Sequence, residues 1–521
     1  MTDVLLDGLV AIPFAFAVLT RLLAPRERTA VAVAVAGGLL TLAWSVWAYA
    51  DSGSSLAGSQ VDHPWIAELG VDWHLGLDGI SGPLVVMTTL VLALSLLSLV
   101  RHDPGCGAVA DLAALLLLIE AGVLGAFLAL DMVLFFLFFE VALIPMWFVI
   151  NAWGDPEDEP GRRRAATRFL VFTVLGSALM LVGFMLVRAQ AGTFDIVVIA
   201  ERYTPHGAAG VTAAFLVVLG LAVKTPVWPL HVWLPDAHAK APTVGSVVLA
   251  AVLLKLGTYG LLRFWLPVVD PSWALLVPFV AALAVVGIVY AALACLAQTD
   301  LKRLIAYSSV GHMGFVVLAV TTYTVGGVQG AVFASVAHGL ITGLLFFLAG
   351  AIKDRYGTGD LGRLSALYGK VPHLGGLFVF GAIASLGLPG LAGFWGEMLA
   401  IRSALFHDDA LPQATFVVLG VIAAFGVILT SAYFLALVRG LLQGAPPAVR
   451  PVNEDVPSIE LATAEVEPGT SMAGAVRTDV DAMEWAAWTP LAVLTVVLGV
   501  VPGLLLTPVG EATRAFFGGL G

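Results

Sequence analysis

Ionisable side chains interrupt several long apolar segments of this sequence, at positions where a charge is hard to accommodate. Glu140 stands within LFFLFFEVALIPMW, Lys255 within VVLAAVLLKLGTYG and Glu397 within LPGLAGFWGEMLA. Lys224 ends another apolar run, two residues before Pro226. A charged side chain at the centre of a membrane costs at least about 2.5–3.5 kcal/mol on insertion scales. These residues must therefore face a protein interior, a water-filled cavity or one another.

Two histidines and a further glutamate belong to the same class of side chain. His312 lies in AYSSVGHMGFVV, His338 in SVAHGLITG, and Glu120 in another apolar segment. Burial disfavours the charged forms of lysine, histidine and carboxylate, so that all of them move toward the neutral state in which protons are exchanged. We therefore predict a proton relay in which the charge of each member depends on the others. The predicted members are Glu140, Lys224, Lys255, His312, His338 and Glu397.

Each of these residues also has a less specialised interpretation. Glu140 fits a static ion pair, and Lys224 could reach the aqueous surface because it stands near a helix break. The two histidines fit hydrogen-bonded core positions, and Glu120 fits a plain hydrogen bond between helices. Lys255 is the hardest to explain in this way, because it lies too deep in its segment to reach the surface.

The segments that carry these residues predict an all-α integral membrane protein. Of the 521 residues, 60% are hydrophobic and 12% are charged, against roughly 45–50% and about 25% in soluble domains. Polar backbone groups in lipid are satisfied within helices, which excludes open strands. We expect about 14 transmembrane helices, near 4–22, 29–50, 80–100, 111–130, 132–150, 165–187, 208–230, 243–262, 273–297, 303–322, 326–350, 373–403, 413–438 and 486–508.

The distribution of Lys and Arg among the connecting loops predicts the orientation. Loops that join odd- to even-numbered spans hold 18 of the 25 Lys and Arg residues, and the other loops and the tail hold 5. Cytoplasmic loops carry the excess of positive charge. We therefore expect the odd-to-even loops on the cytoplasmic side and both termini on the outer side.

Prolines and glycines predict that helices 7 and 12 are broken. Pro226 and Pro229 interrupt the end of the seventh span, and GLPGLAG at 387–393 interrupts the twelfth. The two breaks stand five helices apart, and a five-helix unit repeated in tandem must invert, which is a transporter design. We expect helices 1–3 at 1–110, repeat one at 111–262, inverted repeat two at 263–440, an acidic cytoplasmic loop at 441–485 and a last helix within 486–521.

Cofactor and metal motifs are lacking in the sequence. The two cysteines, Cys106 and Cys295, lie in different segments without a CxxC pattern, so we expect no Fe–S cluster, haem or disulfide on this chain. A metal site at His231, Asp236 and His238 is conceivable, but the spacing matches no standard motif and we predict no metal. The net charge of -11 says little about partners, because most charges lie in loops, and nothing in the sequence suggests a basic face for nucleic acid. The acidic residues 444–484 fit a solvated linker or a docking element for a neighbouring chain.

Several stretches of the sequence resemble the antiporter-like membrane subunits of respiratory complex I, the proton-pumping NADH:quinone oxidoreductase. They span most of the chain and are specific to that superfamily. The stretches are LGLDGISGPLVVMTTL, LDMVLFFLFFEVALIPMW, KTPVWPLHVWLPDAHAKAPTVGSVVLAAVLLKLGTYG, DLKRLIAYSSVGHMGF and GLPGLAGFWGEM.

The resemblance implies a role for each predicted relay residue. It implies a Glu140–Lys224 pair at the coupling end and Lys255 as the central lysine of the half-channels. It implies that the two histidines line the connecting aqueous path, and that Glu397 faces the next subunit or the exit side. In the sibling antiporter-like subunits the position that matches Glu397 is usually lysine, so the resemblance distinguishes this chain from them.

The resemblance also implies the assembly. It implies proton translocation by a membrane-arm subunit in a bacterial plasma membrane, between two antiporter-like neighbours and the lipid bilayer. No redox centre is implied on this chain, whereas NADH, FMN, Fe–S clusters and quinone are expected on partner subunits.

Two other functions remain open at this point. A subunit of a multisubunit Na⁺/H⁺ antiporter or of a membrane-bound hydrogenase would share the superfamily motifs, and the subunits that co-purify would distinguish it. A non-transporting membrane scaffold would need none of the buried charges, and it would tolerate their neutral substitution.

Overall fold

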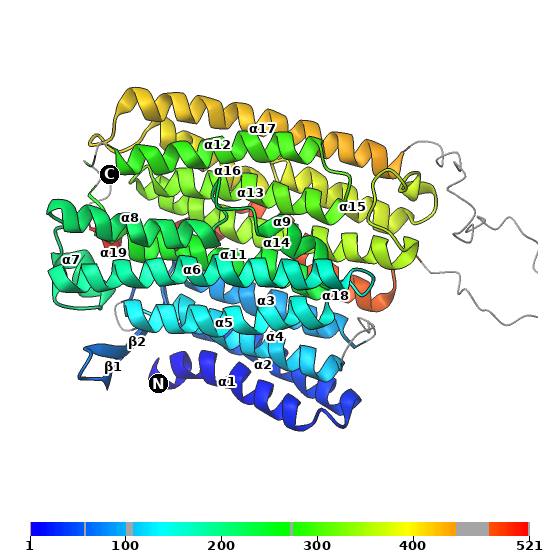
Figure 1. Cartoon of the computed structure of the whole chain (residues 1–521), viewed down its shortest axis with the longest axis horizontal. Helices are drawn as coiled ribbons and strands as arrows, with labels where there is room; N and C mark the ends of the chain where they lie inside the picture. The colour runs from blue at the N-terminus through cyan, green and yellow to red at the C-terminus, as the bar shows by residue number, and fades with distance from the viewer. Residues whose placement is uncertain are drawn as a thin grey trace, which may run out of the picture.

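Long apolar segments of this chain form helices that lie side by side along one direction, as the computed structural model shows (Figure 1). The structure describes residues 2–56, 59–100, 108–270, 273, 275–443 and 479–518. Cys106 and residues 444–478, most of the predicted acidic loop, lie outside the described residues. The bundle is almost entirely helical, which confirms the predicted fold class.

The helices in the first half of the chain surround one small hairpin. In chain order the elements are α1 (Thr2–Leu22), α2 (Glu27–Ser52), β1 (Gln60–Ile66), β2 (Val71–Gly76), α3 (Gly82–Ser98), α4 (Val109–Leu128), α5 (Met132–Trp153), α6 (Glu159–Ala191), α7 (Ile196–Arg202), α8 (Gly207–Lys224) and α9 (Leu234–Lys240).

The second half begins with an irregular helix. The elements are α10 (Thr243–Val248), the π-turn η1 (Leu249–Leu253), α11 (Leu254–Gly260), the π-turn η2 (Leu261–Trp265), η3 (Leu266–Val268), α12 (Leu276–Leu296), α13 (Leu301–Val320), α14 (Val325–Tyr356), η4 (Leu367–Gly369), α15 (Pro372–Ser385), α16 (Ala392–Leu405), α17 (Gln413–Leu442), α18 (Ala482–Val500) and α19 (Gly503–Phe517).

Within the described residues, 12 helices are long and apolar enough to cross a membrane. Two more of the predicted spans correspond to the shorter apolar helices α3 and α15. Many helices begin at a side chain that satisfies free backbone N–H groups. Asp131, for example, accepts hydrogen bonds from Val133 and Leu134 at the start of α5.

Two predicted helices end at other residues in the structure, and one hairpin was not predicted. The seventh span was expected to reach residue 230, but α8 ends at Lys224. The last span was expected at 486–508, but α18 ends at Val500 and a separate helix, α19, follows. The hairpin β1–β2 was not predicted, because its alternation is short and lies between two strongly apolar segments; it projects at one end of the bundle (Figure 1).

The most deeply buried part of the bundle is the helix at 243–268. Its apolar stretch is fully buried, and the neighbouring α14 is almost as well covered. This helix contains two π-turns, one directly before α11 and one directly after it. π-turns insert one extra residue per turn and occur mostly at functional sites. The interruption therefore marks the segment that holds Lys255.

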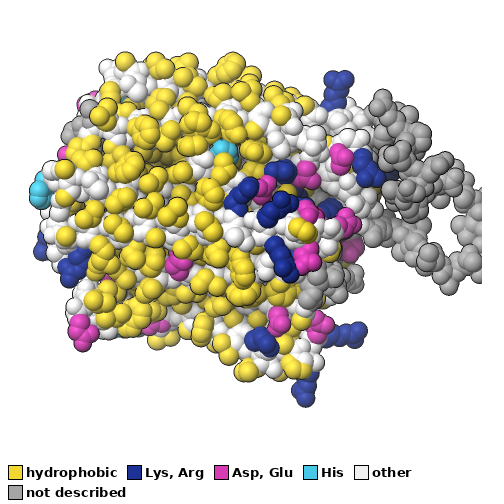
Figure 2. All heavy atoms as spheres, viewed as in Figure 1, with side chains coloured by type: hydrophobic (Ala, Val, Ile, Leu, Met, Phe, Trp, Pro, Cys, Tyr) yellow, Lys and Arg dark blue, Asp and Glu magenta, His cyan; other side chains and the backbone are white. Residues whose placement is uncertain are grey.

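Ion pairs join several helix ends in a charged cluster at one end of the bundle. Asp236 on α9 accepts from Arg168 on α6 and, at 2.6 Å, from Arg303 on α13. Lys240 lies 2.8 Å from Asp158 and 3.3 Å from Asp155, and Lys353 lies 3.5 Å from Asp155. Figure 2 shows most of the visible Lys and Arg side chains gathered there, beside a broad apolar belt. The paired basic residues all come from loops that the sequence assigned to one side.

Opposing effects act on the carboxyl group of Asp155 in this charged cluster. Burial raises the pKa of Asp155, but attraction to Lys353 and Lys240 outweighs burial and leaves the pKa below its ordinary value. The carboxylate is therefore the favoured form in the folded chain.

A second ion pair, fully buried, holds the other end of the 243–268 helix. Arg263 donates from Nη2 to both carboxylate oxygens of Asp78 at 2.7 Å, and both side chains are 1% exposed. The Phe516 ring of α19 lies 4.5 Å from the guanidinium carbon. Gly79 permits this approach of α19, because a Cβ there would lie 2.1 Å from the Pro508 carbonyl oxygen. The pair thus ties the segment before α3 to η2, beside α19.

Candidate functional site

Lys255 lies at the centre of the bundle and contacts a histidine of α14. Its Nζ is 2.6 Å from Nδ1 of His338 and donates to the Ala250 carbonyl oxygen at 2.7 Å. Ala250 belongs to the π-turn η1, whose altered backbone places this carbonyl five residues before the lysine. Lys255 is fully buried, so these two contacts replace the water that it would bind in solution.

His312 joins α13 to both halves of the second broken helix. Its Nδ1 lies 2.8 Å from Oε1 of Glu397 on α16, and its Nε2 lies 2.9 Å from Oγ of Ser385 at the end of α15. The break between these halves was predicted from GLPGLAG and is confirmed at residues 386–391. It allows Ser385 and Glu397 to approach the same imidazole ring from two helices.

A small cavity connects these two groups. The rings of His338 and His312 are 5.6 Å apart between centroids. The cavity of about 20 Å³ beside them is lined by both histidines, Ser385, Thr342 and Glu397. Nε2 of His338 and Oε2 of Glu397 are buried without a hydrogen-bond partner among the described residues. Ala334, Ala337, Ile341 and Gly393 complete the lining, and a cavity of this volume holds about one water molecule, beside the two unpaired atoms.

Lys224 occupies a different environment from Lys255. It is buried at the end of α8, and its Nζ lies 4.9 Å from the Phe139 ring and 5.5 Å from the Phe169 ring. Its Nζ makes no hydrogen bond within the part of the chain that the structure describes. Aromatic faces attract an ammonium group, but they supply no proton acceptor.

Glu140 does not contact Lys224 directly. Both residues are described, yet no hydrogen bond or ion pair joins them; their attraction acts over a longer distance. Glu140 is half-buried on α5, and one of its carboxylate oxygens has no partner among the described atoms. The direct pair that the resemblance implied is therefore open in this structure.

The backbone at the break after Lys224 is satisfied by protein groups. Pro226 has no N–H to donate to the Ala222 carbonyl, but Val227 N donates to that oxygen at 2.9 Å. The Trp233 indole donates to the Val223 carbonyl at 3.0 Å. The break therefore leaves neither of these carbonyls unpaired, because the following turns fold back over it.

Glycines bring the helices of the two lysines close to their neighbours. A Cβ on Gly257 of α11 would lie 2.3 Å from Oγ1 of Thr225, which follows Lys224 directly. A Cβ on Gly220 of α8 would lie 2.3 Å from the Gly176 carbonyl oxygen of α6. Side chains at these positions would push the helices apart.

A sequence profile of the NADH:quinone oxidoreductase/Mrp antiporter transmembrane family matches residues 129–425. The chain belongs to this family. It is 38% identical over 500 residues to NADH-quinone oxidoreductase subunit M of Rhodobacter capsulatus, with 93% of this chain and 90% of the relative covered. All six predicted relay residues lie within the family match.

Solved structures share the fold over the whole chain. A chain of respiratory complex I from Thermus thermophilus with bound NADH has a TM-score of 0.82 and 28% identity, with 100% of both chains covered. A chain of the Mrp complex from Dietzia sp. DQ12-45-1b has a TM-score of 0.77 and 24% identity, over 99% of this chain and 97% of that one. The second likeness shows the fold alone.

The burial of one histidine inside the family match, His238, was not recognised from the sequence. We placed His238 in a polar loop, whereas residues 234–240 form α9 and fold back into the bundle. His238 is fully buried and stacked on Phe346 at 4.5 Å, with no hydrogen-bond partner for either ring nitrogen among the described atoms. It lies within electrostatic range of Lys255 and of Lys302. The polar neighbours of His238 hid this burial.

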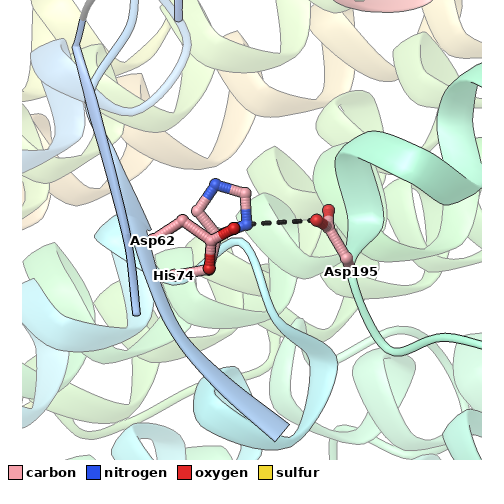
Figure 3. Close-up of side chains that lie close together, drawn as sticks. All are labelled: Asp62, His74 and Asp195. Atoms are coloured by element: carbon pink, nitrogen blue, oxygen red, sulfur yellow. Dashed lines mark ion pairs between the residues drawn. The ribbon is translucent and has the colours of Figure 1, made fainter. Parts of the chain in front are cut away.

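The metal site that we considered at His231, Asp236 and His238 does not form. Asp236 pairs with arginines in the charged cluster, and His231 faces the rings of Tyr290 and Tyr307. A different set, Asp62, His74 and Asp195, is brought together by the hairpin (Figure 3). Distant segments supply it, so no spacing pattern in the sequence could indicate it.

Glu120 remains apart from the relay contacts described above. It is fully buried in α4, and neither carboxylate oxygen has a hydrogen-bond partner among the described atoms. The hydrogen bond between helices that we considered for it is therefore not formed.

Proposed function

We propose that this chain is the proton-translocating, antiporter-like subunit M of an NADH:quinone oxidoreductase in a bacterial plasma membrane. The supporting observation is the polar line from Lys255 through His338 and His312 to Glu397 inside a largely apolar bundle. Its named relative and the complex I chain of the same fold support the assembly. Electron transfer from NADH to quinone takes place on partner subunits, which hold the FMN and Fe–S clusters.

The contacts suggest how a proton moves along this line. The Lys255 ammonium gives a proton to Nδ1 of His338, 2.6 Å away. The same imidazole releases a proton from Nε2, so that its charge returns to neutral. A water molecule in the small cavity carries that proton to Oε2 of Glu397, which has no other partner among the described atoms. His312 holds the other oxygen of Glu397 at 2.8 Å and adjusts its charge.

Lys224 and Glu140 form the control end of the relay in this proposal. Glu140 lies on the same face of α5 as Leu137 and Ile144, which are exposed. A half-buried carboxylate on such a face needs cover from another polypeptide, because lipid cannot solvate it. A neighbouring antiporter-like subunit supplies that cover, and its charge state moves Glu140 relative to Lys224. With the pair apart, Lys224 is less stable as a cation and releases its proton toward Lys255.

Orientation and repeat structure complete the proposal. The charged cluster faces the cytoplasm, both termini face outward, and protons leave on the outer side. Residues 111–262 and 263–440 act as inverted five-helix repeats, with broken backbone after α8 and between α15 and α16. Protons from the cytoplasm reach Lys255 past His238, a buried residue in electrostatic range of both Lys255 and Lys302.

Substitution of Lys255 tests the proposed function. In inverted membrane vesicles, Lys255→Ala should reduce proton transfer through this subunit by about 10²-fold or more, the usual contribution of a proton-transfer group. Lys370→Ala, which removes an exposed lysine, is the matched control and should leave protons pumped per NADH unchanged. Unimpaired turnover and pumping in the assembled Lys255→Ala complex would refute the role of Lys255.

Two measurements address the other functions. Co-purification with flavin and Fe–S subunits supports the oxidoreductase, whereas co-purification with Na⁺/H⁺ antiporter or hydrogenase subunits alone would contradict it. A scaffold would keep full pumping when Glu140, Lys224 and Lys255 are all made neutral. The energetic cost of burying these groups argues against a scaffold.

A further inference from the structure

Three residues from distant parts of the sequence meet beside the hairpin, at the end of the bundle opposite the charged cluster. Asp62 on β1 and His74 on β2 are cross-strand partners. The hairpin is fastened to the rest of the chain by Leu130 N, which donates to the His74 carbonyl at 2.8 Å. Asp131 pairs with Asp195 as an isolated bridge. These backbone contacts hold all three side chains toward one point (Figure 3).

His74 presents an imidazole nitrogen to this point from the interior. The residue is 4% exposed, and its Nε2 lies 3.0 Å from the Gln60 side-chain oxygen. With the Gln60 amide oxygen facing the ring, as assigned here, Nε2 carries the proton, because an amide oxygen only accepts hydrogen bonds. In the neutral ring Nδ1 then has a free lone pair, and Nδ1 makes no hydrogen bond within the described residues. A partner that orients the distal N–H is the usual support of a metal-binding histidine.

One carboxylate oxygen of Asp195 faces Nδ1 of His74, because only the other oxygen is used to cap α7. Oδ1 caps α7 by accepting from Val197 N at 2.7 Å, while Oδ2 lies 3.4 Å from Nδ1 of His74. This separation exceeds the length of about 2.7–2.9 Å expected for a charge-assisted hydrogen bond. Two ligands of a tetrahedral zinc ion, each bound at about 2.0–2.1 Å, lie about 3.3–3.4 Å apart. The observed 3.4 Å between Nδ1 of His74 and Oδ2 of Asp195 matches the distance between two zinc ligands rather than the length of a hydrogen bond.

Asp62 completes the set from the accessible side. Its carboxylate is exposed, and the candidate ligand atoms of the three residues all lie within 4.8 Å of one another. An exposed aspartate can rotate the short distance needed to bind, and it gives a metal ion a path from solution. We propose that Asp62, His74 and Asp195 bind a divalent ion of the zinc class through one atom each, with water as the remaining ligand.

The ligand types decide the class of ion. Ca²⁺ and Mg²⁺ prefer sites built from oxygen atoms, whereas imidazole with carboxylate suits zinc and similar transition metals. A bound ion would join the hairpin to the segment before α7 and stabilise that end of the folded chain. This site is independent of the proton relay, since none of its ligands belongs to the relay.

Zinc binding to the intact complex tests the proposal. The purified complex is treated with a chelator, titrated with ZnCl₂, and bound zinc is counted by mass spectrometry at fixed free zinc. Asp195→Asn keeps a good helix cap but loses a charged ligand, and Asp62→Asn changes only an exposed side chain. Glu68→Gln removes an exposed charge from the same hairpin as the matched control.

The expected result is one zinc ion fewer in Asp195→Asn, and binding of that ion weakened by about tenfold or more in Asp62→Asn. Glu68→Gln should equal the parent, and millimolar Mg²⁺ should not displace the ion. Equal zinc content and affinity in the parent and both aspartate variants would overturn the proposal and leave a simple His74–Asp195 ion pair. Displacement by Mg²⁺ would overturn the assigned class of ion. If Asp195→Asn fails to assemble, Asp62→Asn alone decides.

Discussion

Breaking the buried Asp78–Arg263 pair should destabilise the subunit far more than removing both charges. Asp78→Asn leaves the Arg263 guanidinium without a countercharge, although both side chains are only 1% exposed. Removing one partner of a buried ion pair costs about 3–5 kcal/mol, because the remaining charge is neither paired nor hydrated. At about 1.4 kcal/mol per tenfold change, the folded fraction relative to the unfolded falls about 10²-fold to 4 × 10³-fold.

Thermal inactivation of the purified complex measures this loss. The lower limit of the cost is about 3 kcal/mol. If only half of it, about 1.5 kcal/mol, lowers the barrier to unfolding, Asp78→Asn should inactivate about tenfold faster than the parent. The double variant Asp78→Asn/Arg263→Met removes the unpaired charge and keeps an apolar contact for Phe516. It should recover much of the lost stability. Glu68→Gln changes one charge on the exposed hairpin turn and should inactivate at the parent's rate.

Two results would refute the reasoning about this pair. Inactivation of Asp78→Asn at the parent's rate would mean that the pair contributes no net stability. Equal inactivation of the single and double variants would mean that lost packing, rather than an unpaired charge, causes the damage.

Three further predictions concern the relay, the helix packing and the charged cluster. Glu397→Gln keeps a hydrogen-bond acceptor for His312 but loses the carboxylate, so proton transfer through this subunit should fall by about 10²-fold or more in vesicles. Gly220→Val should cost about 1–3 kcal/mol or more, measured as faster thermal inactivation, because its Cβ would overlap the Gly176 carbonyl. In the folded chain the pKa of the Asp155 carboxyl group is lowered. The carboxylate therefore stabilises the fold above its unfolded pKa of about 3.9, and this stabilisation is lost as the pH falls through the folded pKa. Asp155→Asn should flatten acid inactivation in that range.

Controls for these predictions come from matched positions. Glu201→Gln neutralises an exposed acid on α7 and should leave pumping unchanged; full pumping in Glu397→Gln would remove Glu397 from the relay. Gly376→Val adds a side chain where no atom lies within 4 Å, and equal stability of both valine variants would contradict the packing argument. Parent and Asp155→Asn chains that lose stability in parallel below pH 4 would show that Asp155 contributes nothing there.

The sequence predicted the helices of this fold better than their interruptions. Apolar length and the cost of unpaired backbone in lipid are local properties, and they indicated most spans. The break at 386–391 was predicted because GLPGLAG is itself local. The π-turns around Lys255 were not, since an inserted residue leaves the apolar pattern of a fully buried helix unchanged. The break after Lys224 was predicted from Pro226 and Pro229, but the span was extended to residue 230 because the residues after the break remain apolar although they fold as turns.

The residues proposed for the relay were identified from the energetic cost of burying them, whereas their contacts could not be predicted. A charged residue within an apolar segment can be recognised from the sequence alone, and Lys255 and Glu397 were identified in this way. That Lys255 contacts His338 and that Glu397 contacts His312 depends on how α14, α13 and α16 pack, which no spacing along the chain encodes. His238 shows the opposite failure, because polar neighbours suggested a loop although the residue is buried.

The cavity between the histidines and Glu397 has a consequence for what can cross the membrane here. Its volume of about 20 Å³ admits about one water molecule. A proton crosses such a space by exchange of hydrogen bonds with its neighbours, so no particle has to travel the full distance. A sodium ion would have to move bodily through it and would leave most of its hydration shell behind. If the proposed relay operates, this narrow junction would pass protons but would not admit a hydrated sodium ion.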